Sequence, residues 1–179
     1  MARTVEAQIE AMKQPSRLSD VTLIVGGQKL YLSRHYLAHH SAYFEVLFFG
    51  EFGDKDNEEH ELQGVPYEKF VVYLSMILPN RKEVTARNLS VVLEMADRFE
   101  SVQLVEECEQ LLLKDGAMSA FEKLRLADRY RLTALEQHVL ATMNDWRMLA
   151  GASKFGLHVY STEMKCRLLD KFRTVDITQ

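Results

Sequence analysis

The histidines are the first residues whose spacing suggests chemistry. His35 and His39 lie one helical turn apart, and His40 follows directly. Two imidazoles on one helix face can ligate zinc, but a zinc site needs three or four ligands, and only Glu45 is close in sequence. The ligand set is incomplete, so we expect these histidines to be exposed or near a helix end rather than part of a metal centre.

The two cysteines offer little nucleophilic chemistry. Cys108 stands within LVEECEQLLL, at a position typical of a helix core, and Cys166 is far from it. The chain has no G-x-S-x-G elbow and no cysteine in a recognisable motif with histidine. A small buried apolar role for Cys108 is favoured over a reactive thiol. We therefore predict that the protein is not an enzyme and carries no cofactor.

An acidic segment, 51–61, contains many carboxylates and one histidine, His60. In a glycine-containing loop such carboxylates are most simply a solvated surface. If residues 58–62 form a strand, His60 points the same way as Leu62, toward the core. Two interpretations remain for His60: an imidazole satisfied by a backbone carbonyl, or a local pH-sensitive weak point.

The aromatic residues are concentrated in HSAYFEVLFFGEFGD, residues 40–54, although only 9% of the whole chain is aromatic. Apolar spacing predicts a helix over 42–49 that begins at Ser41 as N-cap. Tyr43, Phe44 and Leu47 are expected to anchor it in the core. Phe48 and Phe49 are adjacent, so they cannot both face inward, and we expect one of them on the surface.

Length and composition indicate a soluble globular protein. The chain has 179 residues, 47% of them hydrophobic, which is enough to bury a core without disulfides. We find no signal peptide and no stretch long enough to span a bilayer, and cysteine usage suits a reducing compartment. These features predict a cytoplasmic or nuclear protein that does not bind membranes.

Charge is unevenly distributed along the chain. Residues 1–118 hold 12 Lys and Arg against 19 Asp and Glu, whereas residues 119–179 hold 10 against 7. A nucleic-acid-binding protein usually shows a strong basic stripe. A small positive excess spread over several expected helices is not such a stripe, so nucleic acid is disfavoured as a partner.

The expected elements place strands first and helices afterwards. VTLIV-GG-QKLYL predicts a hairpin over 21–32 with a two-glycine turn; a phosphate-binding loop would need a helix directly after it. Residues 58–62 predict a third strand, and Pro66 begins a helix that Pro79 ends. Three strands followed by helices indicate an α+β fold.

The second half of the chain contains an internal repeat. MADRFESVQL, 95–104, and LADRYRLTAL, 126–135, match at an offset of 31 residues. Each copy predicts a helix, a tight turn and a second helix. Ser119–Glu122 and Thr133–Glu136 both fit the capping-box pattern. Two hairpins are too few for a free-standing array, so they must stack on the α+β part.

Short apolar stripes occur near both ends. Val5, Ile9 and Met12 form one face of a short N-terminal helix, which must dock on its own domain or on a partner. Residues 161–172 predict a final helix whose apolar face either packs as core or presents a groove to a partner. That face consists of Met164, Leu168 and Phe172.

The order of these marks resembles a known family. SDVTLIVGGQKLYLSRHYLAHHSAYFEVLFFGEF, then HELQGVPYEKFVVYLSMILP, then the 95–104 helix and Cys108, resemble a BTB/POZ domain over about residues 18–113. Residues 114–150 resemble the 3-box, or start of a BACK region, that follows this domain in ubiquitin-ligase adaptors. The expected organisation is an N-terminal helix at 1–17, the domain at 18–113, a helical hairpin at 114–150 and a helical tail at 151–179.

The resemblance implies a small three-stranded sheet covered by helical hairpins, followed by an all-helical extension. It also implies a homodimer through the N-terminal helix, with Val5, Ile9 and Met12 as interface candidates. Asp20 and Arg34 match a charged pair that lies near the dimer groove of relatives.

Members with the extension commonly bind cullin-3 through a hydrophobic-x-Glu motif after the aromatic helix. Phe52, Gly53 and Asp54 occupy that place here, with Asp54 one methylene shorter than Glu, and Phe48 and Phe49 are further contact candidates.

Two functions follow from the resemblance. The first is a non-enzymatic adaptor, a dimer that links cullin-3 to an unknown substrate protein. The second is a homo-oligomerising scaffold, transcriptional or cytoskeletal, that does not bind cullin; a monomeric linker is a more distant variant. Adaptors usually carry a MATH domain or a Kelch propeller, and we expect neither end of this chain to hold one.

Overall fold

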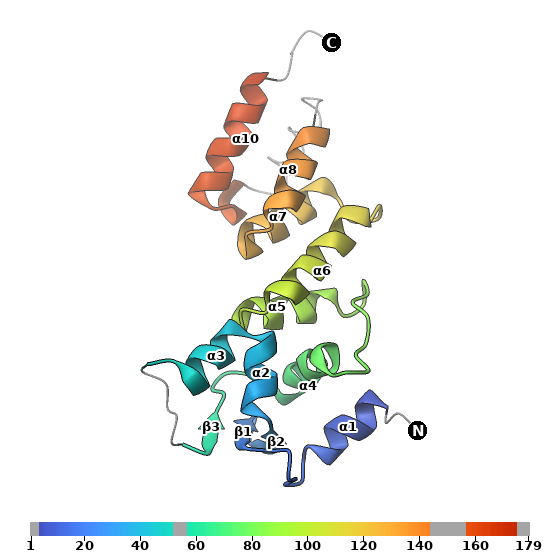
Figure 1. The fold of residues 1–179 in the computed structure, drawn as a ribbon. Coiled ribbons are helices and arrows are strands. Elements are labelled where there is room, and N and C mark those ends of the chain that lie inside the picture. The colour runs from blue at the N-terminus through green and yellow to red at the C-terminus, as the bar shows by residue number, and fades with distance from the viewer. Residues whose placement is uncertain (1–3, 52–56, 144–156, 175–179) are drawn as a thin grey trace. The chain divides into compact units, whose positions relative to one another are not determined.

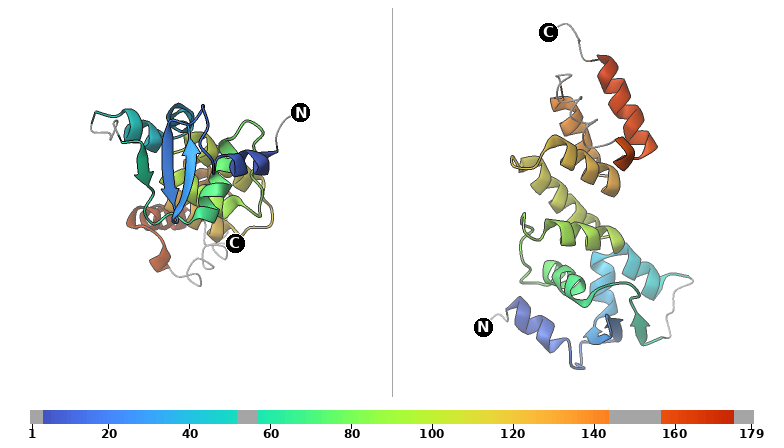
Figure 2. Two further views of the ribbon diagram at one scale, coloured as in Figure 1. Left: turned by 90° about the horizontal axis from the view of Figure 1, so that it is seen from below. Right: turned by 180° about the vertical axis from the view of Figure 1, so that it is seen from behind.

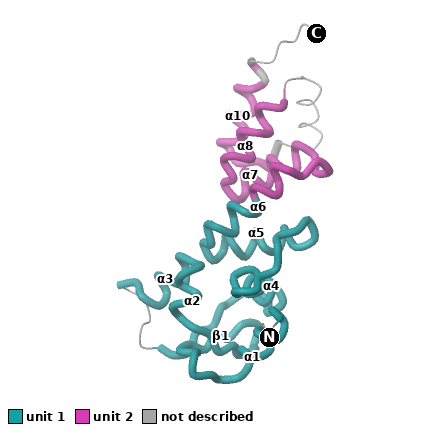
Figure 3. The backbone as a smooth tube through the Cα atoms, turned by 45° about the vertical axis from the view of Figure 1, so that its right-hand side comes forward, with its two compact units in different colours: residues 1–108 teal, residues 109–179 magenta. Residues whose placement is uncertain are grey.

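The computed structural model describes residues 4–51, 57–143 and 157–174. Its elements follow in the order shown in Figure 1. Contacts divide the chain into two compact units, 1–108 and 109–179 (Figure 3), and each is described by itself. Within the described ranges, no helix is both long enough and apolar enough to cross a membrane.

The sheet of the first unit confirms the predicted strands. β1 (Val21–Val25) pairs antiparallel with β2 (Gln28–Leu32), and β3 (Glu59–Glu61) pairs parallel with β1 on its other side (Figure 2). Val25 faces Gln28, so only Gly26 and Gly27 form the turn. Their φ angles are +54° and +78°, a conformation that glycine adopts without strain.

Two short helices follow the hairpin and meet at Ser41. α2 (Arg34–His40) ends there, and α3 (Ala42–Phe49) begins there, as the sequence predicts. The Ser41 hydroxyl accepts a hydrogen bond from the backbone N–H of Phe44 at 3.2 Å and donates one to the backbone carbonyl of Phe99. Ser41 is buried, so one side chain both caps α3 and ties the joint to the core.

An aromatic cluster forms the centre of this unit. The ring of Phe44 stacks on that of Phe99 with centroids 5.0 Å apart and on that of Phe48 at 5.7 Å. Phe70 and Tyr73 of α4 (Tyr67–Ile77) pack against Phe99 from another direction. Phe99 caps the end of α5 (Leu89–Arg98), so the cluster joins α3, α4 and α5 in one core.

The N-terminal helix α1 (Val5–Ala11) lies beside α4 (Figure 2). Its stripe packs against its own chain: Val5 and Ile9 are buried with Leu78, and Met12 lies against the same cluster. Of the two docking places that the sequence allows, the structure shows this one for Val5 and Ile9, and the predicted contact with a second copy is not tested by a single chain. A helix this short is marginal alone, and Leu78 supplies the nearest apolar surface for it.

The predicted repeat is confirmed in the backbone. The helices α5 and α7 (Ala120–Tyr130) both end in a left-handed residue, Glu100 at φ 50° and Arg131 at φ 57°. In each copy the next N–H bonds back to the matching alanine, Ser101 to Ala96 at 2.8 Å and Leu132 to Ala127 at 2.9 Å. This is the same helix-ending motif, placed 31 residues apart.

One of the two predicted capping boxes is wrong. Ser119 and Glu122 do form the reciprocal pair at the start of α7. α8 (Thr133–Thr142) begins after Leu132 with no side-chain cap, and the backbone N–H of Leu135 donates to the carboxylate of Glu109 at 2.9 Å. Glu136 instead pairs with Arg167. A carboxylate from α6 (Val102–Lys114) therefore supplies the cap that the local sequence seemed to contain.

The final helix, α10 (Thr162–Thr174), packs as core in the second unit, with Met164 and Leu168 buried. The 3-10 turn η1 (Leu157–Val159) leads into it, and the Tyr160 hydroxyl donates to the carbonyl of Phe121 at 3.2 Å. The Phe172 side chain lies outside the described residues. The structure groups α7, α8 and α10 in one unit.

The joint at Ser41 yields the first prediction. Replacing Ser41 with alanine leaves the buried carbonyl of Phe99 and the N–H of Phe44 without this partner, so we expect the free energy of unfolding to fall by about 1–3 kcal/mol. Urea denaturation measures the change. Ser33 precedes α2 but makes no capping bond, so Ser33→Ala is the matched control, with an expected loss below about 0.5 kcal/mol. Equal losses in the two variants would contradict the role given to Ser41.

Candidate functional site

The outer face of α3 carries an exposed apolar stripe. Tyr43, Val46 and Phe49 recur every three residues and are 37%, 64% and 41% exposed. We name these three residues the α3 stripe. The inner face of the same helix holds Phe44 and Phe48, which are buried in the aromatic cluster. The sequence signal for this exposed stripe is a short helix that is apolar on both faces, because only one of the two faces can pack in the core.

The structure also decides between the two adjacent phenylalanines. Phe48 is 1% exposed and Phe49 is the surface residue. A buried ring offers no area to a partner, so burial favours Phe49 over Phe48 as a contact candidate, and the contact itself stays a prediction. Phe52, Gly53 and Asp54, the other predicted contacts, lie outside the described residues.

Two histidines of α2 adjoin the α3 stripe. The His35 ring stacks on the Phe49 ring, with centroids 4.8 Å apart and planes at 24°. His35, His39 and Glu45 line one open pocket of about 450 Å³ with Ala38 and Phe49. Among the described residues, no group of three histidine, cysteine or carboxylate side chains is placed to hold a metal ion.

Asp20 and Arg34, the predicted charged pair, lie together and are joined by hydrogen bonds that connect neighbouring elements of the fold. The Asp20 carboxylate accepts a hydrogen bond from the backbone N–H of Arg34 at 2.7 Å, which satisfies a donor at the start of α2. The Arg34 guanidinium donates to the carbonyl of Asn57 at 2.7 Å and lies 5.8 Å from the centroid of the Phe48 ring. The pair therefore connects β1, α2 and the residue that leads into β3.

His60 of β3 contacts the same backbone carbonyl of Asn57 that the Arg34 guanidinium contacts. Its side chain is buried, as the strand alternation predicts, and its Nε2 lies 2.9 Å from the carbonyl oxygen of Asn57. The ring also meets the edge of Phe48 at 5.5 Å between centroids. A histidine satisfied by a backbone carbonyl is the interpretation that this geometry supports.

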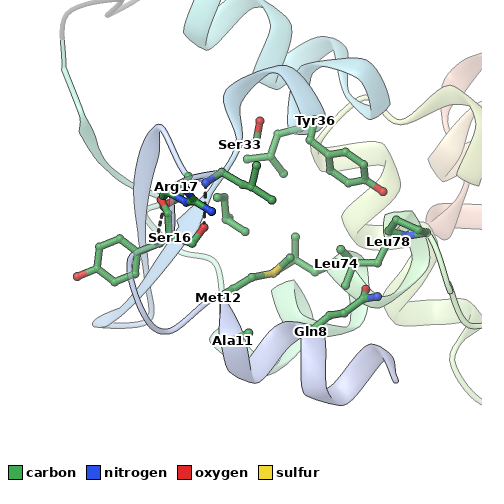
Figure 4. A pocket seen from close by; sticks show the side chains of 15 residues that line it. Gln8, Ala11, Met12, Ser16, Arg17, Ser33, Tyr36, Leu74 and Leu78 are labelled. Carbon is green, nitrogen blue, oxygen red and sulfur yellow. Dashed lines mark hydrogen bonds between the residues drawn. The ribbon is translucent and has the colours of Figure 1, made fainter. Parts of the chain in front are cut away.

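A second surface feature is an apolar pocket of about 470 Å³ between α1, the 16–19 turn, α2 and α4 (Figure 4). Met12 reaches it from the end of α1 and Tyr36 from α2, as Figure 4 shows. Leu74 lines it from α4 and Leu78 from the end of that helix. Neither Asp20 nor Arg34 lines it. The pocket has the size and the mainly apolar wall of a site that another molecule fills.

Leu18 lines this pocket and is 86% exposed. The turn that carries it is held by hydrogen bonds: the N–H of Ser16 donates to the Ser19 hydroxyl at 2.9 Å, and that hydroxyl donates to the Ser16 carbonyl at 2.8 Å. Leu18 is therefore fixed in an outward position. The sequence pattern does not single it out, although it is the one apolar residue in the polar run QPSRLSD.

The buried ionisable groups do not suggest catalysis. Cys108 is fully buried, as predicted, and burial raises the pKa of its thiol to about 12, which keeps it protonated and unreactive near neutral pH. Burial likewise raises the pKa of Tyr73 to about 12, and its hydroxyl is hydrogen-bonded to Ser101 at 2.7 Å. Both side chains are structural parts of the core.

Comparisons with known proteins agree with this architecture. The model of the BTB/POZ domain family matches residues 9–116. The match ends before α7, so the 3-box or BACK likeness of residues 114–150 stays a prediction.

Individual relatives share the same region. The chain is 32% identical over 130 residues to BTB and MATH domain-containing protein 38 of Caenorhabditis elegans, which covers 73% of this chain and 34% of that protein. It is 30% identical over 139 residues to BTB and MATH domain-containing protein 36 of the same organism, covering 77% of this chain and 43% of that protein. Kelch-like protein 6 of Homo sapiens is 28% identical over 132 residues, 73% of this chain and 21% of that protein.

The chain thus spans less than half the length of these curated relatives. The matched residues hold the sheet, the α2–α3 joint and the helices α4, α5 and α6, and the domain family to which they belong is a non-enzymatic protein-interaction module. On the match over residues 9–116, the chain belongs to the BTB/POZ domain family.

Proposed function

We propose that this chain is a non-enzymatic adaptor: a BTB homodimer that docks on the cullin-3 N-terminal region and brings a target protein to the ubiquitin ligase. The observation that carries the proposal is the α3 stripe. Tyr43, Val46 and Phe49 expose aromatic and aliphatic surface on a helix whose other face is fixed in the core.

The stripe has the properties of an interface hot spot. Aromatic side chains are enriched at such sites, and a helix held rigid before binding loses little conformational entropy on binding. Ser41 and the stacked rings of Phe44 and Phe48 provide that rigidity. In the sequence, Phe52-Gly53-Asp54 follows this helix, at the place where the family resemblance implies a cullin contact.

The homodimer is proposed on the face that holds the apolar pocket and Leu18. A symmetric pair uses the same patch on both copies, so a projecting residue and a recess on one face can be satisfied together. Leu18 projects and the pocket beside it is apolar. The proposed occupant of each pocket is therefore Leu18 from a second copy, and the interface moves from Val5 and Ile9 to this face.

The identity of the target is left open by this proposal. The relatives carry MATH or Kelch in their names, and the matched region is only part of those proteins. Target recruitment is proposed through the helices of the second unit or through an associated protein, in the cytoplasm or nucleus. A homo-oligomerising scaffold without cullin binding is the alternative that the experiment must separate.

The α3 stripe gives a direct binding prediction. We expect Phe49→Ala and Val46→Asp each to weaken binding to the purified cullin-3 N-terminal region by at least about tenfold, because each removes apolar area from the centre of the contact. Calorimetric titration of the full chain measures the dissociation constants. Leu169→Ala, which changes an exposed leucine of α10, is the matched control and should bind like the wild type.

The outcomes distinguish the two functions. No binding by the wild-type chain would remove the adaptor proposal and favour the scaffold. Binding by the wild type that neither stripe variant weakens would move the docking surface away from α3.

The dimer has its own prediction. We expect light scattering to show a dimer for the wild type and a monomer for Leu18→Asp, because a carboxylate buried in an apolar pocket loses its hydration without a partner. Val46→Asp serves as the control and should remain dimeric, because Val46 does not line the pocket. A monomeric wild type would refute the dimer, and a dimeric Leu18→Asp would refute this face as its interface.

A further inference from the structure

The two exposed histidines of α2 lie where a partner on the α3 stripe would cover them. His35 and His39 are one turn apart and therefore share a helix face. His35 stacks on Phe49, a member of the stripe, and His39 lines the same pocket as Phe49. A molecule that buries the Phe49 ring from solvent also takes water away from these imidazoles.

Removing water from an imidazole favours its neutral form. Histidine is the side chain whose charge changes closest to neutral pH. An imidazolium buried against the apolar surface of a partner loses hydration that only an opposite charge can replace. A partner complementary to Tyr43, Val46 and Phe49 is apolar at this contact and brings no opposite charge of its own.

Charged and titratable groups lie near these imidazoles on both α2 and α3. From α3, Glu45 lines the pocket and provides a negative charge beside the two imidazoles in the free protein. On α2, the Arg34 guanidinium is directed to the carbonyl of Asn57. His40 meets the edge of the His39 ring at 4.9 Å; burial lowers the pKa of His40, and the charges of His39 and Arg81 lower it further.

We propose that docking on the α3 stripe requires neutral His35 and His39, so that affinity for the partner rises as the pH rises from 6.0 to 7.5. This inference rests on the proposed cullin-3 adaptor function and adds a regulation to the same surface. Protons leave the two imidazoles on binding, and mild acidification releases the partner.

The test is the pH dependence of binding. Dissociation constants of the full chain for the cullin-3 N-terminal region are measured at pH 6.0, 6.75 and 7.5 at constant ionic strength. Each proton released on binding adds at most about tenfold in affinity per pH unit, so we expect the wild type to bind several-fold more tightly at pH 7.5 than at pH 6.0. His35→Gln/His39→Gln should lose this gain, because glutamine stays neutral throughout.

Two controls make the result specific. His158→Gln changes an exposed histidine of η1 in the other unit and should keep the wild-type pH dependence. Circular dichroism at each pH verifies that the double variant is folded.

Wild type and double variant with the same pH dependence, or tighter wild-type binding at pH 6.0, would overturn this inference alone. No wild-type binding at any pH would overturn the adaptor function together with it.

Discussion

The hydrogen bonds of one buried hydroxyl determine how the first unit is built. Ser41 ends one helix, starts the next and holds the carbonyl of Phe99, a residue 58 positions along the chain. Because its partners are fixed, the rotation of α3 about its axis is fixed as well. Phe44 and Phe48 then have to enter the aromatic cluster, and Tyr43, Val46 and Phe49 have to remain outside it.

The same helix therefore packs one face into the core and leaves an apolar stripe exposed on the other. Its inner rings are buried among aromatic side chains of α4 and α5, which is the usual source of stability in a small domain. Its outer residues can expose apolar area without loss of the fold, because the core does not need them. The hydrogen bonds among Asp20, Arg34, Asn57 and His60 join the sheet to α2, the helix that leads into the joint at Ser41.

The N-terminal helix likewise contributes both to the core and to a surface feature, the apolar pocket. Val5 and Ile9 are buried against Leu78, so α1 is a part of its own domain. Its docking forms one wall of the apolar pocket, and the hydrogen-bonded turn after it presents Leu18 at the rim. The proposed dimer interface rests on this apolar pocket and on the exposed leucine beside it.

The sequence by itself determined the elements and the family. The Gly26-Gly27 turn, the strand with His60, the N-cap at Ser41 and the repeat at Ala96 and Ala127 all depend on local spacing, and each is present in the structure. The ordered marks over about residues 18–113 also indicated the BTB/POZ family, which the match over residues 9–116 shows.

Only the tertiary structure decided which faces are buried. It placed Phe48 inside and Phe49 outside, turned Val5 and Ile9 toward Leu78, replaced the expected cap of α8 with Glu109, and exposed Leu18. Periodicity identifies that a face is apolar, but the surface that covers it comes from residues distant in sequence. Such distant residues are Phe99 for α3, Leu78 for α1 and Glu109 for α8. No local sequence pattern predicts these contacts.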